Sequence, residues 1–242
     1  MTRALLLGLG LAALAVTPSV EAKPLKAKPK GATCEGAVRF TSDALLTLAI
    51  VRNGTIERDD GQCDEPFGKG QTWSAINRFG KVVGTVADAT SPTAGMHWKT
   101  VSGTQGAHVY VRGRKAPYAS AAWSAPAGEK KKVLTDIGAK VAREVEFFQS
   151  GERRFAIVVE RSTFSIAEKD LKGHWKRKYH QKNFVGFPVY ALRAVLDMNG
   201  DGMPEVIQHF SEDAQGHGFE VVLARKANGD WHEIASNEDT GP

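Results

Sequence analysis

Long apolar runs are nearly absent from this sequence, which excludes a protein held in a membrane by helices. A spanning helix needs about 20 apolar residues at a rise of about 1.5 Å each. The one long apolar run, residues 4–16, is too short for a permanent span, and no later segment approaches that length. Arg3 precedes this run and small residues follow it near Ala22, which predicts a secretory signal peptide over residues 1–22. We therefore expect a soluble mature protein without a transmembrane segment, secreted or periplasmic.

Cysteine is scarce as well. Cys34 and Cys63 are the only two, with no Cys-x-x-Cys spacing and no histidine near either one in sequence. This arrangement disfavours a reactive thiol pair. In an oxidising compartment two cysteines predict one structural disulfide. A bridge between Cys34 and Cys63 would close a loop of about thirty residues, worth about 3 to 4 kcal/mol in the chain-entropy model.

The short motifs of common enzyme classes are missing too. The chain has no Gly-x-Ser-x-Gly elbow, no phosphate-cradling glycine loop and no dinucleotide fingerprint. Residues 232–236, HEIAS, are close to the zinc-protease motif His-Glu-x-x-His, but Ser236 stands where the second zinc ligand must be. A catalytic Ser, His and Asp set that assembles only in three dimensions has no fixed order in sequence, so catalysis stays open.

Basic residues are in modest excess, with a formal net charge of +5. Residues 23–31, KPLKAKPKG, cannot bury enough apolar surface to offset the entropy of ordering them, so they predict a disordered basic linker. The basicity favours anionic surfaces, and an anionic cell-surface polymer is the candidate partner. The basic and aromatic segment 172–182 is compatible with a nucleic-acid groove. Its alternation favours a half-buried strand, and no nucleic-acid motif occurs elsewhere, so we expect no nucleic-acid partner.

Strand composition dominates the rest of the chain. In residues 44–59, Asn53-Gly54 stands between two strand-like runs, and Asn-Gly is the strongest two-residue hairpin signal because both turn residues need positive φ. Further segments rich in β-branched and aromatic residues are 81–88, 107–112, 153–163 and 174–180.

One segment, residues 133–148, has two competing periods. Apolar residues from Leu134 to Phe148 recur at helical spacings of three and four, whereas residues 141–147 also fit the two-residue period of a strand. Gly138 weakens the helical interpretation. We favour a helix and leave the strand open. The expected fold class is mainly β: an antiparallel meander or sandwich-like, β-rich α+β fold with one helix.

The C-terminal fifty residues have the most regular pattern. Short turns separate four strand-like segments, which predicts an antiparallel meander. The segments are 188–196, 205–210, 219–226 and 231–236. No second copy of this unit occurs upstream, so no repeat architecture is predicted. We divide the folded chain into an N-terminal β region over residues 32–130, with the disulfide, and a C-terminal region over residues 131–242, with the helix and the meander.

An acidic loop joins the first two strands of that meander and reads DMNGDGMPE, residues 197–205. Calcium takes six to eight oxygen ligands, and alternate residues of a tight loop can supply them. The predicted ligands are Asp197, Asn199, Asp201 and Glu205 by their side chains and Met203 by its backbone carbonyl. A plain polar hairpin turn is the alternative. Three like charges within nine residues repel one another unless a cation lies among them, so the loop predicts calcium as a cofactor.

Two calcium-binding families share parts of this pattern. The EF-hand has the same opening Asp-x-Asn-x-Asp-Gly, but its eighth and twelfth positions are occupied here by Pro204 and Gln208, and the flanks look like strands. The pattern D-x-N-G-D-G-x-P-E-V between two strands instead resembles the calcium loop of the integrin-alpha-type FG-GAP repeat and its bacterial VCBS relative. In those families the loop joins two strands of a β-propeller blade. The resemblance implies the same five ligands, with Glu205 where Asp is more usual.

Together these patterns predict an exported β protein with a structural calcium site, serving as a binding or structural module of the periplasm or cell surface. The alternative is a secreted hydrolase that acts on an anionic cell-surface polymer. A calcium-dependent shift in melting temperature would favour the first prediction.

Overall fold

The structure is a computed structural model that describes eight stretches of the chain. They are residues 36–39, 47–58, 72–91, 95–100, 105–113, 121–182, 189–211 and 218–238. The expected signal peptide, the basic linker and the predicted disulfide between Cys34 and Cys63 lie outside these residues. Within them, no helix is both long and apolar enough to cross a membrane.

Seven antiparallel strands form the β1–β7 sheet, in the order β3-β2-β1-β7-β4-β5-β6. They are β1 (Gly36–Arg39), β2 (Thr47–Arg52), β3 (Thr55–Glu57), β4 (Thr72–Ile76), β5 (Val82–Ser91), β6 (Gly95–Thr100) and β7 (Val109–Gly113). The predicted Asn-Gly hairpin is confirmed, because β2 and β3 meet at Asn53 and Gly54, with φ of 51° and 71°. Both values lie in the left-handed region that this turn requires.

Four further strands form the β8–β11 sheet, in the order β11-β10-β9-β8. They are β8 (Glu144–Ser150), β9 (Arg153–Val159), β10 (Thr163–Lys169) and β11 (Trp175–Lys182). Each strand pairs antiparallel with its neighbour in sequence. The predicted strand 153–163 is correct only up to Val159, because a turn follows and Thr163 already opens β10, whereas the predicted strand 174–180 falls in β11.

The segment with two competing periods is half helix and half strand. Helix α1 (Glu129–Ile137) ends where Gly138 adopts φ 70°, and the Ala139 N–H closes the turn onto the Leu134 carbonyl at 2.9 Å. A glycine in this conformation is a common helix end. The helical prediction is thus confirmed only up to Ile137. From Glu144 onwards the two-residue period was the correct interpretation, because those residues belong to β8.

The predicted C-terminal meander is confirmed as the β12–β15 sheet, with strand order β12-β13-β14-β15. Its strands are β12 (Val189–Leu196), β13 (Glu205–Ser211), β14 (Gly218–Arg225) and β15 (Trp231–Glu238). All three pairings are antiparallel. The protein is therefore mainly β with one helix, as the composition and turns predicted.

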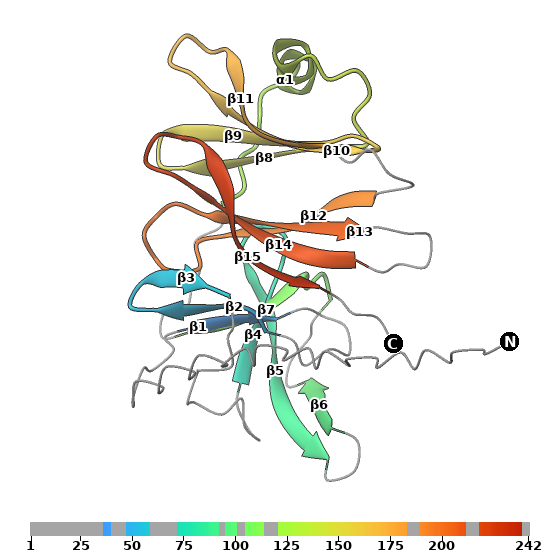
Figure 1. Ribbon diagram of the computed structural model, residues 1–242, viewed down its shortest axis with the longest axis vertical. Coiled ribbons are helices and arrows are strands. Elements are labelled where there is room, and N and C mark those ends of the chain that lie inside the picture. The colour runs from blue at the N-terminus through green and yellow to red at the C-terminus, as the bar shows by residue number, and fades with distance from the viewer. Residues whose placement is uncertain are drawn as a thin grey trace, which may run out of the picture. The chain divides into compact units, whose positions relative to one another are not determined.

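The sheets and the helix share three cores that define successive layers (Figure 1). One face of the β12–β15 sheet packs on the β8–β11 sheet, where Trp231 meets Phe148 and Phe155 edge-on at 6.1 and 5.8 Å. Its other face packs on the β1–β7 sheet through residues such as Leu196. Helix α1 covers the remaining face of the β8–β11 sheet with Val133. Because the β12–β15 sheet is buried on both faces, its strands are apolar at consecutive positions and not only at alternate ones.

Candidate metal centre

The acidic loop, residues 197–205, leads from the end of β12 to Glu205, the first residue of β13, and its base is fixed. Leu196 pairs with Glu205 across the two strands, and Leu196 is fully buried. The two methionines of the loop anchor it on opposite sides. Met198 is buried in the core shared with the β1–β7 sheet, and Met203 packs against the core shared with the β8–β11 sheet. The flanking elements are strands, as the comparison with the EF-hand led us to expect.

Asp197 organises the backbone of the loop. Its Oδ1 accepts hydrogen bonds from the backbone N–H of Gly200 at 2.7 Å and of Asp201 at 3.1 Å, and its Oδ2 accepts one from Gly202 at 2.9 Å. Gly200 and Gly202 have φ of 78° and 86°, which only glycine adopts without strain. One carboxylate therefore holds the loop folded around itself.

Asn199 and Asp201 hold the exposed tip. The Asn199 side chain accepts from the Asp201 N–H at 3.1 Å and donates to Asp201 Oδ2 at 3.3 Å. Asp201 Oδ1 accepts from the Met203 N–H at 2.7 Å. The side-chain oxygens of this tip are thus engaged with N–H groups of the loop itself.

Glu205 is the buried member of the predicted ligand set. It is 3% exposed, and its Oε2 accepts a hydrogen bond from the Met198 N–H at 2.8 Å. Burial, followed by the negative charges of Asp201 and Asp197, raises its pKa from 4.5 to about 8. Near pH 7 this carboxyl therefore carries a proton while no cation accompanies it.

The donor chemistry of the loop fits calcium. All the predicted ligand atoms are oxygens, and three of the ligands are carboxylates. The negative charges of Asp197 and Asp201 both act on the Glu205 carboxyl, whose pKa they raise. Within the described stretches, however, no three His, Cys, Asp or Glu side chains are arranged to hold a metal ion. The structure thus gathers the predicted residues in one loop, where their side-chain oxygens accept hydrogen bonds from N–H groups of that loop. The calcium site stays a prediction.

One residue at this loop was not found from the sequence. Ser150, at the end of β8, donates a hydrogen bond from Oγ to the Gly202 carbonyl at 2.5 Å. The two residues are 52 positions apart, and a lone serine at a strand end gives no signal in sequence. This contact ties the acidic loop to the first hairpin of the β8–β11 sheet.

No protein-family model, curated protein or solved structure matches this chain. The FG-GAP and VCBS resemblance of the loop therefore stays a prediction from its own residues.

Proposed function

We propose that the protein is an exported binding or structural module whose β12–β15 sheet is stabilised by one calcium ion in the acidic loop. The observation that carries the proposal is the buried carboxyl of Glu205 beside Asp197 and Asp201, with its raised pKa. A buried carboxylate is costly unless a proton or a cation neutralises it. A loop that brings two further carboxylates to such a group suits a divalent cation better than a plain hairpin turn.

The chain would hold calcium through the five predicted ligands. Asp197, Asn199, Asp201 and Glu205 would supply side-chain oxygens, and Met203 would supply its carbonyl. The ion contributes positive charge that offsets the repulsion among the carboxylates. The residues themselves fix the base of the loop and keep Met198 and Met203 in the two cores. In this proposal the ion rigidifies a hairpin and takes no part in catalysis.

The experiment is thermal unfolding at pH 7.5 in EGTA and in excess calcium. A ligand that binds only the folded state at 100 times its Kd stabilises that state by about 2.7 kcal/mol, so the melting temperature rises. Asp201→Asn removes one ligand charge and is expected to abolish most of the rise. Asp230→Asn is the matched control, because Asp230 lies in the exposed β14–β15 turn of the same sheet.

Identical melting curves with EGTA and with calcium would overturn the proposal. So would an equal calcium response in the wild-type protein and in Asp201→Asn. Isothermal titration with calcium, run on the same three proteins, checks that the thermal shift reflects one bound ion.

A further inference from the structure

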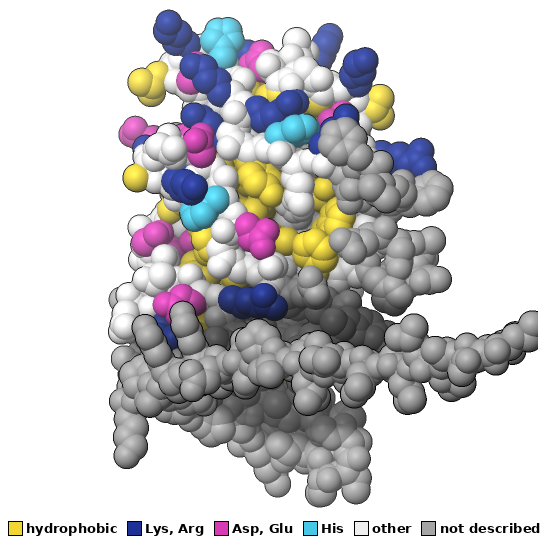
Figure 2. All heavy atoms as spheres, in the orientation of Figure 1, with side chains coloured by type: hydrophobic (Ala, Val, Ile, Leu, Met, Phe, Trp, Pro, Cys, Tyr) yellow, Lys and Arg dark blue, Asp and Glu magenta, His cyan; other side chains and the backbone are white. Residues whose placement is uncertain are grey.

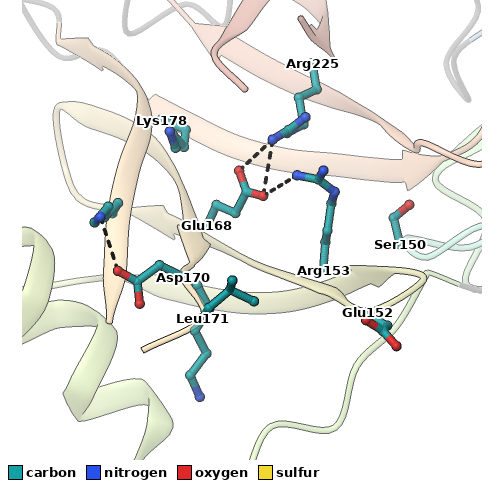
Figure 3. Close-up of a pocket in the computed structure, with 10 residues that line it drawn as sticks. Ser150, Glu152, Arg153, Glu168, Asp170, Leu171, Lys178 and Arg225 are labelled. Carbon is teal, nitrogen blue, oxygen red and sulfur yellow. Dashed lines mark hydrogen bonds and ion pairs between the residues drawn. The ribbon is translucent and has the colours of Figure 1, made fainter. Parts of the chain in front are cut away.

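A pocket of about 710 Å³ lies where the β8–β9 and β10–β11 hairpins meet the end of β14 (Figure 3). Its described lining includes five Lys or Arg side chains and three carboxylates, which leaves a net charge of +2. The volume is in the usual range for sites that take small ligands. We call it the Arg153 pocket, after the most exposed arginine of its wall.

A carboxylate bridges two arginines inside this pocket. Glu168 Oε1 accepts from Arg153 Nη1 at 2.8 Å, and Glu168 Oε2 accepts from Arg225 Nη2 at 3.0 Å. Figure 3 shows the Glu168 carboxylate between the two guanidinium groups. Glu168 and Arg225 are largely buried, whereas the Arg153 side chain is 52% exposed. Two cations fixed by one anion leave positive charge and free N–H donors on Arg153, held in position for a second anion.

Lys178 adds a cation that no carboxylate neutralises. It lies on β11, half-buried, and has no ion-pair partner among the described residues. Figure 3 shows Lys178 to the left of the Glu168 carboxylate and Arg153 to its right. Lys176 differs, because it pairs with Asp170 at 3.2 Å. In Figure 2, Lys and Arg side chains also gather at the end of the molecule that carries β11 and α1.

The lining of the Arg153 pocket combines cations, carboxylates and a hydroxyl group, and this combination indicates which class of anion it would bind. Nucleic acid would need flat side chains on which bases stack, and none of the described lining residues is aromatic. Glu152 and Asp170 would repel a dense run of phosphates, but carboxylates and the Ser150 hydroxyl suit the hydroxyl groups of a sugar. A sugar that itself carries a carboxylate suits both the basic side chains and the hydroxyl-binding carboxylates of the lining.

We propose that the Arg153 pocket binds carboxylate-bearing sugar residues of an acidic polysaccharide, with Arg153 and Lys178 contacting the carboxylate. The inference names a partner for the binding module proposed above and rests on that proposal for its biological setting. It also gives Ser150 a position between two sites, because Ser150 lines the pocket and donates to the Gly202 carbonyl of the acidic loop. Order in the loop would therefore help to hold one wall of the pocket.

The test is isothermal titration calorimetry at low ionic strength with a hexamer of galacturonic acid, in EGTA and again in excess calcium. The wild-type protein is expected to bind the hexamer, and Lys178→Gln and Arg153→Gln are each expected to weaken binding about tenfold, as charge-assisted hydrogen bonds are lost. Lys130→Gln on the exposed start of α1 is the control of equal net charge, and its affinity should stay within twofold. Lys178→Gln leaves the Glu168 ion pairs intact, and equal melting temperatures show that each variant is folded.

Two other probes decide the ligand class. A neutral glucose hexamer is expected not to bind, and an oligothymidylate of equal charge is expected to bind at least tenfold more weakly than the galacturonate. Absence of galacturonate binding, equal binding in both pocket variants, or equal binding of the oligothymidylate would overturn the inference. A calcium-dependent melting shift without galacturonate binding would overturn only the pocket proposal. Galacturonate binding without that shift would overturn only the calcium proposal.

Discussion

The β8–β11 and β12–β15 sheets are two consecutive meanders with the same strand order. Their last hairpins are also built alike. In each five-residue turn the first N–H donates to the fifth carbonyl, at 2.8 Å from Asp170 to His174 and 2.7 Å from Lys226 to Asp230. In each, a glycine at the fourth position has positive φ, 83° at Gly173 and 94° at Gly229. The last two strands of each sheet are thus joined by the same type of turn.

Their first hairpins differ. β8 and β9 are joined tightly through Gly151 and Glu152, whereas β12 and β13 are separated by the acidic loop. A two-residue turn is sufficient for an antiparallel pair of strands. The extra residues of the acidic loop are therefore not needed to build the meander, which is why we look there for function. The difference teaches that short turns are enough to build both scaffolds and that the acidic loop is an addition to the second one.

The largest loss of stability is expected from a substitution that breaks the contact between the two meanders. Phe155→Ala removes a fully buried ring that stacks on Phe148 at 4.8 Å and meets Trp231 edge-on. We expect a loss of about 3 to 5 kcal/mol in the free energy of unfolding, measured by urea denaturation. Leu171→Ala, at a fully exposed turn residue of the same sheet, is the control and should change little. A loss below about 1 kcal/mol for Phe155→Ala would mean that the two sheets are stable independently of each other.

An effect of similar size, spread over several pH units, tests the loop that distinguishes the second meander. The pKa of Glu205 is about 8 in the folded protein, above the ordinary value of 4.5. Between these values the folded state binds the extra proton, so in EGTA the stability is full below about pH 4.5 and falls as the pH rises through 8. The fall is on the order of 5 kcal/mol, and Glu205→Gln should lack it.

Chemical denaturation at several pH values measures this slope. Calcium should stabilise the wild-type protein more at pH 8.5 than at pH 6, because the ion takes the place of the proton. A wild-type profile as flat as that of Glu205→Gln would show that the Glu205 carboxyl is not held in its neutral form.

The smallest effect compares the two matching turns. Gly173→Ala and Gly229→Ala each force a side chain into the left-handed region, which costs about 1 kcal/mol. At Gly229 the new Cβ would also stand 2.9 Å from Arg225 Nη2, whereas at Gly173 the nearest atom is 3.9 Å away. Thermal unfolding should therefore show a larger loss for Gly229→Ala. The reverse order would indicate that Arg225 moves without cost and does not hold the Arg153 pocket in shape.

The sequence predicted those features that depend on local backbone preference and period. The Asn53-Gly54 hairpin, the four C-terminal strands and the acidic loop between two of them follow from residues that lie next to one another. The segment from 133 to 148 was harder, because its two periods are both real and are separated by Gly138. A single period over the whole segment was the wrong assumption.

The sequence by itself therefore determined the Asn53-Gly54 hairpin, the four C-terminal strands and the residues of the candidate calcium loop. Only the tertiary structure decided that a second meander stacks on the first, that Glu205 is buried, and that Ser150 reaches Gly202. It also assembled the Arg153 pocket from the β8–β9 and β10–β11 hairpins and the end of β14. The physical reason is that burial, ion pairing and pKa depend on neighbours that are distant in sequence, whereas turn geometry and strand period depend on neighbours along the chain.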